Sequence, residues 1–186
     1  MVKNYLVAML LIVLFIFVKP TFAASEAGSS ARLEQSSYDQ KRIDEYAEYT
    51  AKKLTIVRVL KANNSHLISE VDAFMDACTA YDLDCYLLPS ITGLESSFGK
   101  FYAPGTYNPF GWGGGYIVFD SWSDGIMTVG KGLREGYVDQ GLLTIEEIGP
   151  RYAESPTWAV RVRSISNKFE SVEQEHAYHA SILALE

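Results

Sequence analysis

The sequence predicts a mainly α domain that carries one small β element, and three observations lead to this fold class. Apolar residues recur at spacings of three and four along most of the chain after residue 38, which is typical of amphipathic helices. Residues 98–122 interrupt this pattern with a stretch rich in glycine and aromatic residues. Within that stretch, residues 116–119 (Tyr-Ile-Val-Phe) give the one good strand signal and predict a small β-hairpin.

The first 23 residues have the features of an export signal. Lys3 gives a basic start, residues 5–18 form an uncharged apolar run, and small residues around Ala23 offer a cleavage site. As a helix this run would rise about 21 Å, which is short of a bilayer's hydrocarbon core. We therefore expect a secreted, periplasmic or envelope-associated protein that is cleaved near Ala23. Lys19 at the end of the run is unusual for a cleaved signal and leaves an uncleaved membrane anchor as the alternative.

Residues 24–40 are small and polar, and this composition predicts a flexible linker. Residues 41–186 then form the expected domain, which is long enough for one hydrophobic core, and we expect a monomer. The chain has a net charge of −7 and no long basic run. Loss of the leader with its two lysines makes the chain more acidic still, which argues against nucleic acid as a partner.

Two helices are predicted before residue 82. Residues 63–65 break the first helix, and Ser65 can cap the second, which ends around Tyr81. The apolar stripe of the first helix consists of Ile43, Ala47, Leu54, Val57 and Leu60.

Cys78 and Cys85 are the only two cysteines. In an exported chain oxidation is favoured, and this spacing closes a short local loop. We expect a disulfide that contributes about 2 kcal/mol, because a short loop stabilises less than a long one. Two unpaired buried thiols are the alternative, and the lack of nearby His or Cys partners argues against a metal.

A third helix starts near Cys85 and ends in a carboxylate. Leu88, Ile91 and Glu95 follow one another at spacings of three and four around the helix. This predicts that Glu95 lies on the buried side of the last turn, which is an unusual position for a carboxylate without a function.

The remaining helices have clear start signals. Ser121 opens one helix, Thr144 begins a capping box, and the Ser-Pro pair at 155–156 opens the closing helix. His176 and His179 continue the apolar stripe of the closing helix. We interpret them as its polar end rather than as metal ligands, because no third ligand is near.

Three short motifs follow in order along this framework. They are residues 95–99 (Glu-Ser-Ser-Phe-Gly), 107–113 (Tyr-Asn-Pro-Phe-Gly-Trp-Gly) and 152–159 (Tyr-Ala-Glu-Ser-Pro-Thr-Trp-Ala). Together they resemble the bacterial glucosaminidase domain (mannosyl-glycoprotein endo-β-N-acetylglucosaminidase-like) of the lysozyme-like superfamily, over roughly residues 65–169. This chain has Trp158 where the family usually has a tyrosine.

The resemblance implies a lysozyme-like helical domain with a β-hairpin lobe beside an active-site cleft. It implies an enzyme, a glycoside hydrolase that cleaves β-1,4 bonds next to N-acetylglucosamine in peptidoglycan without a cofactor. It also implies that Tyr152 lies near Glu95 and the cleaved bond.

The residues themselves fit such chemistry. A glycosidic oxygen is a poor leaving group and must be protonated as the bond breaks, so Glu95 is the candidate general acid. Sugar rings present apolar faces and a rim of hydroxyls, which aromatic and amide side chains can contact; core packing is the alternative role of these aromatics. The candidate substrate-binding residues are Tyr107, Asn108, Phe110, Trp112 and Tyr116.

A second carboxylate is missing from its expected place. Members of the family often carry a glutamate in the hairpin, whereas residues 113–119 contain no acid, and Asp120 is the candidate substitute. Three routes stay open: a displaced acid, help from the substrate's acetamido group, or a lytic transglycosylase reaction with Glu95 alone. A non-catalytic glycan-binding module and a structural envelope protein are alternative functions, and chitin-like oligosaccharides or N-glycan cores are alternative substrates.

Overall fold

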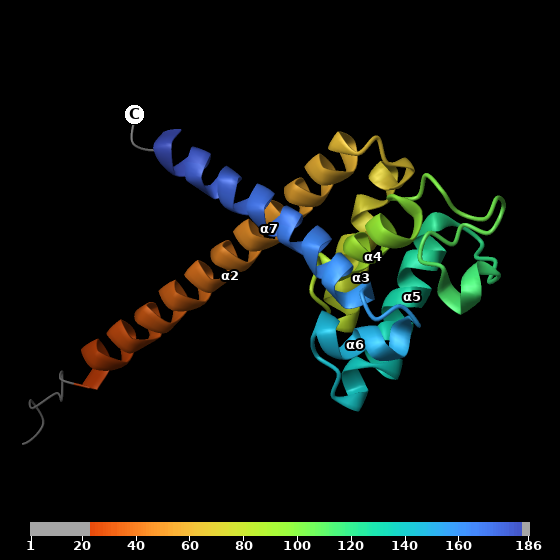
Figure 1. The fold of residues 1–186 in the computed structure, drawn as a ribbon. Coiled ribbons are helices and arrows are strands. Elements are labelled where there is room, and N and C mark those ends of the chain that lie inside the picture. Colours follow the sequence, from red (N-terminus) through yellow and green to blue (C-terminus); the bar gives the residue numbers. More distant parts are fainter. Residues whose placement is uncertain (1–22, 184–186) are drawn as a thin grey trace, which may run out of the picture. The chain divides into compact units, whose positions relative to one another are not determined.

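The computed structural model describes residues 23–183 of the chain, with the side chains of Arg32 and residues 34–183. The predicted leader therefore lies outside the described residues except for Ala23. The described part is mainly helical, as predicted (Figure 1). The elements in chain order are α2 (Ala23–Ala62), η1 (His66–Glu70), α3 (Val71–Tyr81), α4 (Leu87–Ser96), η2 (Trp112–Gly115), α5 (Trp122–Gly136), η3 (Val138–Gln140), α6 (Ile145–Tyr152) and α7 (Trp158–Leu183).

The first long helix, α2, starts earlier than the sequence predicts. Residues 24–40, for which the composition predicts a linker, are helical and continue into the rest of α2. Alanine, glutamate and glutamine, which are good helix formers, make up seven of these seventeen residues. Once a helix is nucleated, each further residue that becomes ordered adds one hydrogen bond, so extension is easier than nucleation. The compact unit to which the last turns of α2 belong begins at Glu48, after the expected boundary at residue 41.

The predicted apolar stripe of α2 is wrong in its first half. Ile43 is 61% exposed and Leu54 is 52% exposed, whereas Ile56 and Leu60 are fully buried. Periodicity identifies a face of a helix, but only packing decides over which turns that face meets a core. In α2 the buried face begins at Thr55.

The core of the compact unit lies between five helices, α3 to α7, and the last turns of α2. α3 packs on α5, and both α4 and α6 pack on α7. Tyr86, just before α4, stacks on Phe169 of α7 with 5.2 Å between the ring centroids. Among the described residues, no helix is long and apolar enough to cross a membrane. The fully buried large side chains include Phe74, Leu88, Ile91, Phe110, Ile126, Leu133, Ile148 and Phe169.

The disulfide prediction is confirmed. Cys78 in α3 is bonded to Cys85, which lies two residues before α4, and their Cα atoms are 4.9 Å apart. The bond ties the last turns of α3 to the start of α4, the helix that carries Glu95.

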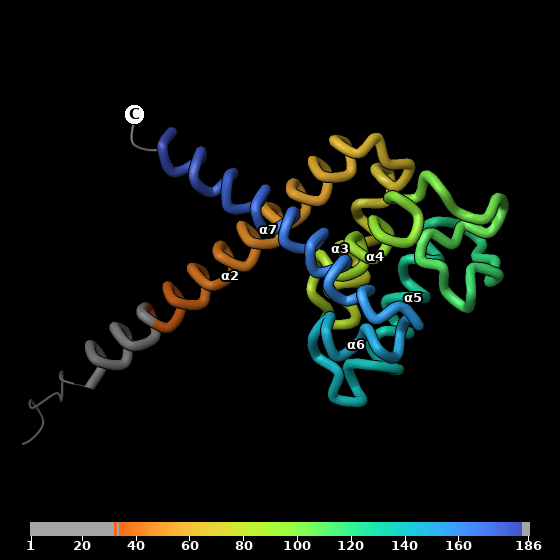
Figure 2. The backbone as a smooth tube through the Cα atoms, in the orientation of Figure 1, coloured from red at the N-terminus to blue at the C-terminus, as the bar shows by residue number. Residues whose placement is uncertain are grey.

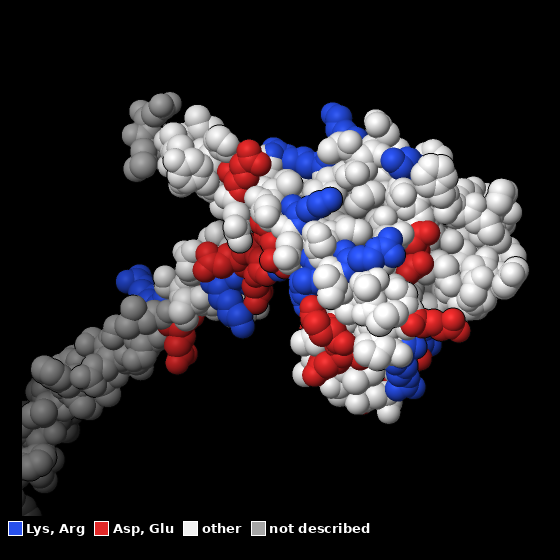
Figure 3. Space-filling model, in the orientation of Figure 1, with Lys and Arg blue, Asp and Glu red and all other residues white. Residues whose placement is uncertain are grey.

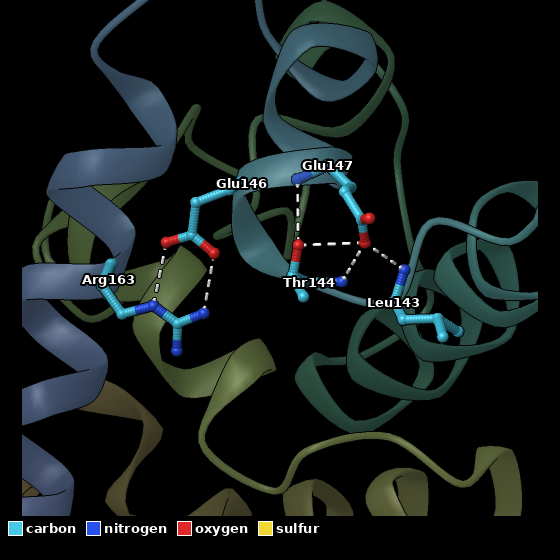
Figure 4. Close-up of polar contacts among 5 residues, drawn as sticks. All are labelled: Leu143, Thr144, Glu146, Glu147 and Arg163. Carbon is cyan, nitrogen blue, oxygen red and sulfur yellow. Dashed lines mark hydrogen bonds and ion pairs between the residues drawn. The ribbon is translucent and has the colours of Figure 1, made fainter.

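Side-chain caps fix several helix starts. The Ser65 side chain accepts a hydrogen bond from the Leu67 N–H, and the Ser121 side chain accepts one from Asp124. At α6 the full capping box is present: the Thr144 hydroxyl accepts from the Glu147 N–H, and the Glu147 carboxylate accepts from the Thr144 N–H (Figure 4). Such reciprocal bonds satisfy amide groups that have no partner inside the helix.

The predicted β-hairpin is wrong for the described residues, because no strand occurs among residues 23–183. Residues 97–121 instead form a long loop, whose path can be followed in Figure 2. Three consecutive glycines, 113–115, have φ between 61° and 82°, so the chain curls into η2 just before the predicted strand. An isolated backbone hydrogen bond, from the Phe119 N–H to the Thr106 carbonyl, joins the two limbs of the loop. β-branched and aromatic residues form a strand only where a partner backbone continues the ladder.

Candidate active site

Glu95 lies in the last turn of α4 with its side chain exposed, so the predicted buried position is wrong. Leu88, Thr92 and Ser96 are buried and follow one another at intervals of four. Because successive helix residues are about 100° apart, Glu95 projects from the edge of this buried row rather than from its centre.

The Glu95 carboxylate has a hydrogen-bond donor from the far end of the sequence. Trp158, the first residue of α7, donates from Nε1 to Glu95 Oε1 at 2.7 Å. Trp158 is 3% exposed, so its ring holds this N–H in a fixed direction. One carboxylate oxygen is therefore anchored, and the rotamer of Glu95 with it.

The other carboxylate oxygen faces the loop at Gly111. A Cβ atom on Gly111 would lie 3.4 Å from Glu95 Oε2, and the φ angle of this glycine is +63°. Glycine lets the backbone pass this close to a side chain with a left-handed conformation. The second motif thus meets the first at its carboxylate.

Tyr152 connects the third motif to the same loop. Its hydroxyl donates to the Phe110 carbonyl at 3.0 Å, and its ring stacks on Trp158 with 4.6 Å between the centroids. Burial, with a contribution from the negative charge of Glu95, raises the pKa of Tyr152 well above its usual value of 10.0. The hydroxyl therefore stays protonated and remains a donor. Tyr152 lies near Glu95, as the resemblance implies, and its hydroxyl is engaged with the loop.

The first motif anchors the loop through its serine. Ser96 Oγ lies 2.8 Å from the Pro109 carbonyl and 3.0 Å from the Thr92 carbonyl, and it accepts the Gly99 N–H at 2.9 Å. A Cβ on Gly99 would lie 2.8 Å from the Leu67 side chain. The Glu-Ser-x-x-Gly pattern therefore presents Glu95 and binds the residues that surround it.

Asn108 braces the loop from within. It is 3% exposed; its Nδ2 donates to the carbonyls of Trp112 (2.9 Å) and Ile117 (3.2 Å), and its Oδ1 accepts the Trp112 N–H at 3.0 Å. Both amide hydrogens and the amide oxygen are thus used inside the protein. In this structure Asn108 holds the glycine-rich turn rather than presenting its amide to a ligand.

A pocket of about 350 Å³ opens beside this arrangement. Glu95 does not line this pocket, but Gly111, which lies close to Glu95 Oε2, does. Trp112 forms one wall and tilts against Tyr152, with 5.7 Å between the ring centroids. Its volume is within the range of small-ligand sites, at the low end. The lining residues are Gly111, Trp112, Gly113, Gly114, Tyr137 and Tyr152.

The other predicted contact residues lie outside this pocket lining. Phe110 is fully buried in the core, while Tyr107 is 39% exposed and meets the ring of Trp122 edge-on. Tyr116 is 89% exposed on the same loop. No charged residue occurs between Lys100 and Asp120, and Figure 3 shows the corresponding surface without Lys, Arg, Asp or Glu at the right of the view.

The structure does not bring the candidate second acid into the pocket. Asp120 is exposed, its N–H donates to Asp124 Oδ2, and it is absent from the lining. No carboxylate at all lines the pocket in the described part of the chain. Residues 23–183 also contain no group of three or more His, Cys, Asp or Glu side chains arranged to hold a metal ion.

Sequence reasoning missed three contributors to the site. The sequence singles out Trp158 only as the replacement of a tyrosine and includes Gly111 only as part of the second motif, and it does not single out Tyr137. The sequence does contain a signal for Trp158 and Gly111, because both lie inside the motifs. Nothing in the local sequence points to Tyr137, whose place in the pocket depends on how α5 meets the loop.

A comparison of the chain with models of known protein families finds no match, and a comparison with curated proteins finds none either. The likeness to glucosaminidase domains therefore rests on the three motifs, and these three motifs are the segments that contact one another around Glu95.

Proposed function

We propose that this chain is a glycosidase that cleaves β-1,4 bonds next to N-acetylglucosamine in peptidoglycan, with Glu95 as the proton donor. The observation that carries the proposal is the convergence on one carboxylate: Trp158 donates to Oε1, and Gly111 lies against Oε2. A helix-end glutamate that served only solubility would have no reason to be held from two distant segments.

The asymmetry of the two oxygens supports an acid role. An indole N–H can only donate, so Oε1 must act as the acceptor whether or not the carboxyl group carries a proton. A proton on Glu95 therefore belongs on Oε2, the oxygen that lies beside Gly111. That is where a general acid would deliver it to a leaving glycosidic oxygen.

In this proposal Tyr152 is a positioning residue. Its hydroxyl is bound to the Phe110 carbonyl, and its ring supports Trp158. It thus links the loop that carries Gly111 to the residue that holds Glu95.

A second candidate reaction is lytic cleavage, and the position of Asp120 favours it, because this candidate second acid is exposed and does not line the pocket. Hydrolysis needs a base or nucleophile opposite the acid. In lytic cleavage Glu95 protonates the leaving glycosidic oxygen as its bond to the sugar carbon breaks; a hydroxyl of the substrate then bonds to that carbon, returns its proton to the Glu95 carboxylate and leaves an anhydro product. The same observation motivates the third alternative, a glycan-binding module without activity.

The decisive experiment is digestion of purified cell walls by wild type and by Glu95→Gln, followed by mass spectrometry of the soluble sugars. Loss of a general acid lowers the rate by about 10²–10⁴-fold, and Asp120→Asn should leave it unchanged. A reducing sugar end identifies hydrolysis and an anhydro sugar identifies lytic cleavage. A folded Glu95→Gln protein that digests walls at the wild-type rate would refute the proposal, and binding without any released sugar would identify a binding module.

Trp158→Phe tests the anchoring bond separately. Phenylalanine keeps the aromatic ring but lacks the N–H, and a hydrogen bond to a charged group contributes about 1.5–3 kcal/mol. We expect kcat to fall by about 10–100-fold with little change in KM, since the indole touches the acid and not the glycan. A change confined to KM would place Trp158 in substrate binding instead.

A further inference from the structure

A second concave site lies on the compact unit, away from Glu95. It is a groove of about 640 Å³ between the last turns of α2 and the C-terminal half of α7, which cross in Figure 1. It shares no lining residue with the pocket beside Glu95. The lining residues are Arg58, Val59, Ala62, Asn63, Lys168, Ser171, Val172, Glu175, His176 and His179.

The polar groups along this groove are mostly hydrogen-bond donors. Arg58 Nη1 lies 2.5 Å from Nδ1 of His176. A guanidinium can only donate, so Nδ1 accepts and the remaining proton of a neutral imidazole is on Nε2. Arg58, His176 Nε2 and the Lys168 ammonium therefore all offer N–H groups. The Ser171 hydroxyl donates to the Asn167 carbonyl and therefore does not change the excess of donors in the groove.

One acceptor completes the rim. Glu175 is the only acidic residue of the lining, and its carboxylate lies 3.8 Å from His179 Nε2. The chain as a whole has a net charge of −7, whereas the groove is lined by two fixed positive charges and one negative charge. Such a rim attracts an anion and can also accept an N–H from the same ligand.

The apolar floor is made of small side chains, namely Val59, Ala62 and Val172. Methyl-sized groups fit such a floor, whereas a long acyl chain would need a deeper apolar slot. A smaller hollow of about 250 Å³ continues from the groove, since it shares Val59, Asn63 and Lys168, and it reaches Lys100. The groove and the hollow together form one longer concave surface. Lys168 lines both parts, and Lys100 lines the hollow.

We propose that this groove binds a short peptide that carries a free carboxylate and small side chains. The carboxylate meets Arg58 and Lys168, the small side chains lie on the Val59–Val172 floor, and a peptide N–H reaches Glu175. A fatty acid would also meet the cations, but it has no N–H group to donate to Glu175. The inference goes beyond the proposed glycosidase and stands without it, because no atom of the groove belongs to the Glu95 site.

The test is fluorescence anisotropy of rhodamine-labelled trialanine with the full-length chain. The peptide with a free C-terminal carboxylate should bind, and its C-terminal amide should bind about 10-fold or more weakly, because a charge-assisted hydrogen bond is lost. Lys168→Ala should weaken binding of the free carboxylate by a similar factor. Arg161→Ala is the matched control: it removes the same charge from an exposed position of α7 outside the groove and should leave binding unchanged.

Each outcome of this titration supports or overturns the peptide proposal. No binding at millimolar protein, equal binding of acid and amide, or an equal loss in Arg161→Ala would overturn the proposal. Stronger binding of dodecanoate, measured by displacement of the same probe, would assign the groove to lipid carboxylates and overturn the peptide as its occupant. Glu95→Gln should bind the probe as wild type does. Failure of the glycosidase proposal can therefore be distinguished from failure of the peptide-groove proposal.

Discussion

Asn108→Ala separates the bracing role of this side chain from a role in binding substrate. The substitution removes three hydrogen bonds, to the Trp112 carbonyl, the Trp112 N–H and the Ile117 carbonyl. At about 1 kcal/mol each the loss would reach about 3 kcal/mol, and water entering the partly exposed loop would recover part of it. We expect the free energy of unfolding to fall by about 2–3 kcal/mol, or Tm by about 4–12 °C for a chain of this length.

The assay is urea unfolding followed by circular dichroism, with cell-wall binding measured on the same samples. Asn108→Asp is the informative partner variant. It keeps an acceptor for the Trp112 N–H but sets a carboxylate against two carbonyl oxygens, so it should be at least as destabilising as Asn108→Ala at neutral pH. An Asn108→Ala protein with wild-type stability and weakened wall binding would refute the reasoning and return Asn108 to the substrate contacts.

Three further changes have expected outcomes of their own. Gly111→Ala should lower wall digestion well below that of Gly105→Ala, because both residues have positive φ but only at Gly111 would a Cβ contact the Glu95 carboxylate. Equal effects of the two substitutions would contradict this. Reduction of the disulfide should cost about 2 kcal/mol of stability, measured by urea unfolding with and without reductant. The Arg163 hydrogen bonds lower the pKa of Glu146 below its usual 4.5, so the pair stabilises above pH 4.5 and this contribution disappears as pH falls through the lower folded value. Arg163→Gln should therefore cost at most about 1 kcal/mol at pH 7, since the pair is half-exposed, and nothing at pH 2.

The capped helices show how much of this fold the local sequence predicts. Ser121 and Thr144 cap the helices that the sequence assigns to them, because a cap is formed between residues two or three positions apart. Ser65 caps η1, which leads into α3, rather than α3 itself. The Cys78–Cys85 bond is equally local and was predicted from spacing.

Elements that depend on distant partners were predicted less well. The strand signal at residues 116–119 is real in composition, yet no second segment pairs with it in the described chain. The stripe on α2 is real in period, yet Ile43 meets no core while Ile56 does. In both cases the deciding contact lies outside the segment that gives the signal.

The candidate site divides in the same way. The sequence by itself determined that Glu95 ends a helix before a glycine-rich loop, and that three motifs follow in a fixed order. Only the tertiary structure decided what they do together: Trp158, 63 positions away, anchors the carboxylate, and Asn108 turns inward to hold the loop. The physical reason is that a hydrogen bond fixes two groups at about 3 Å, and which distant groups reach that distance is set by how the helices pack.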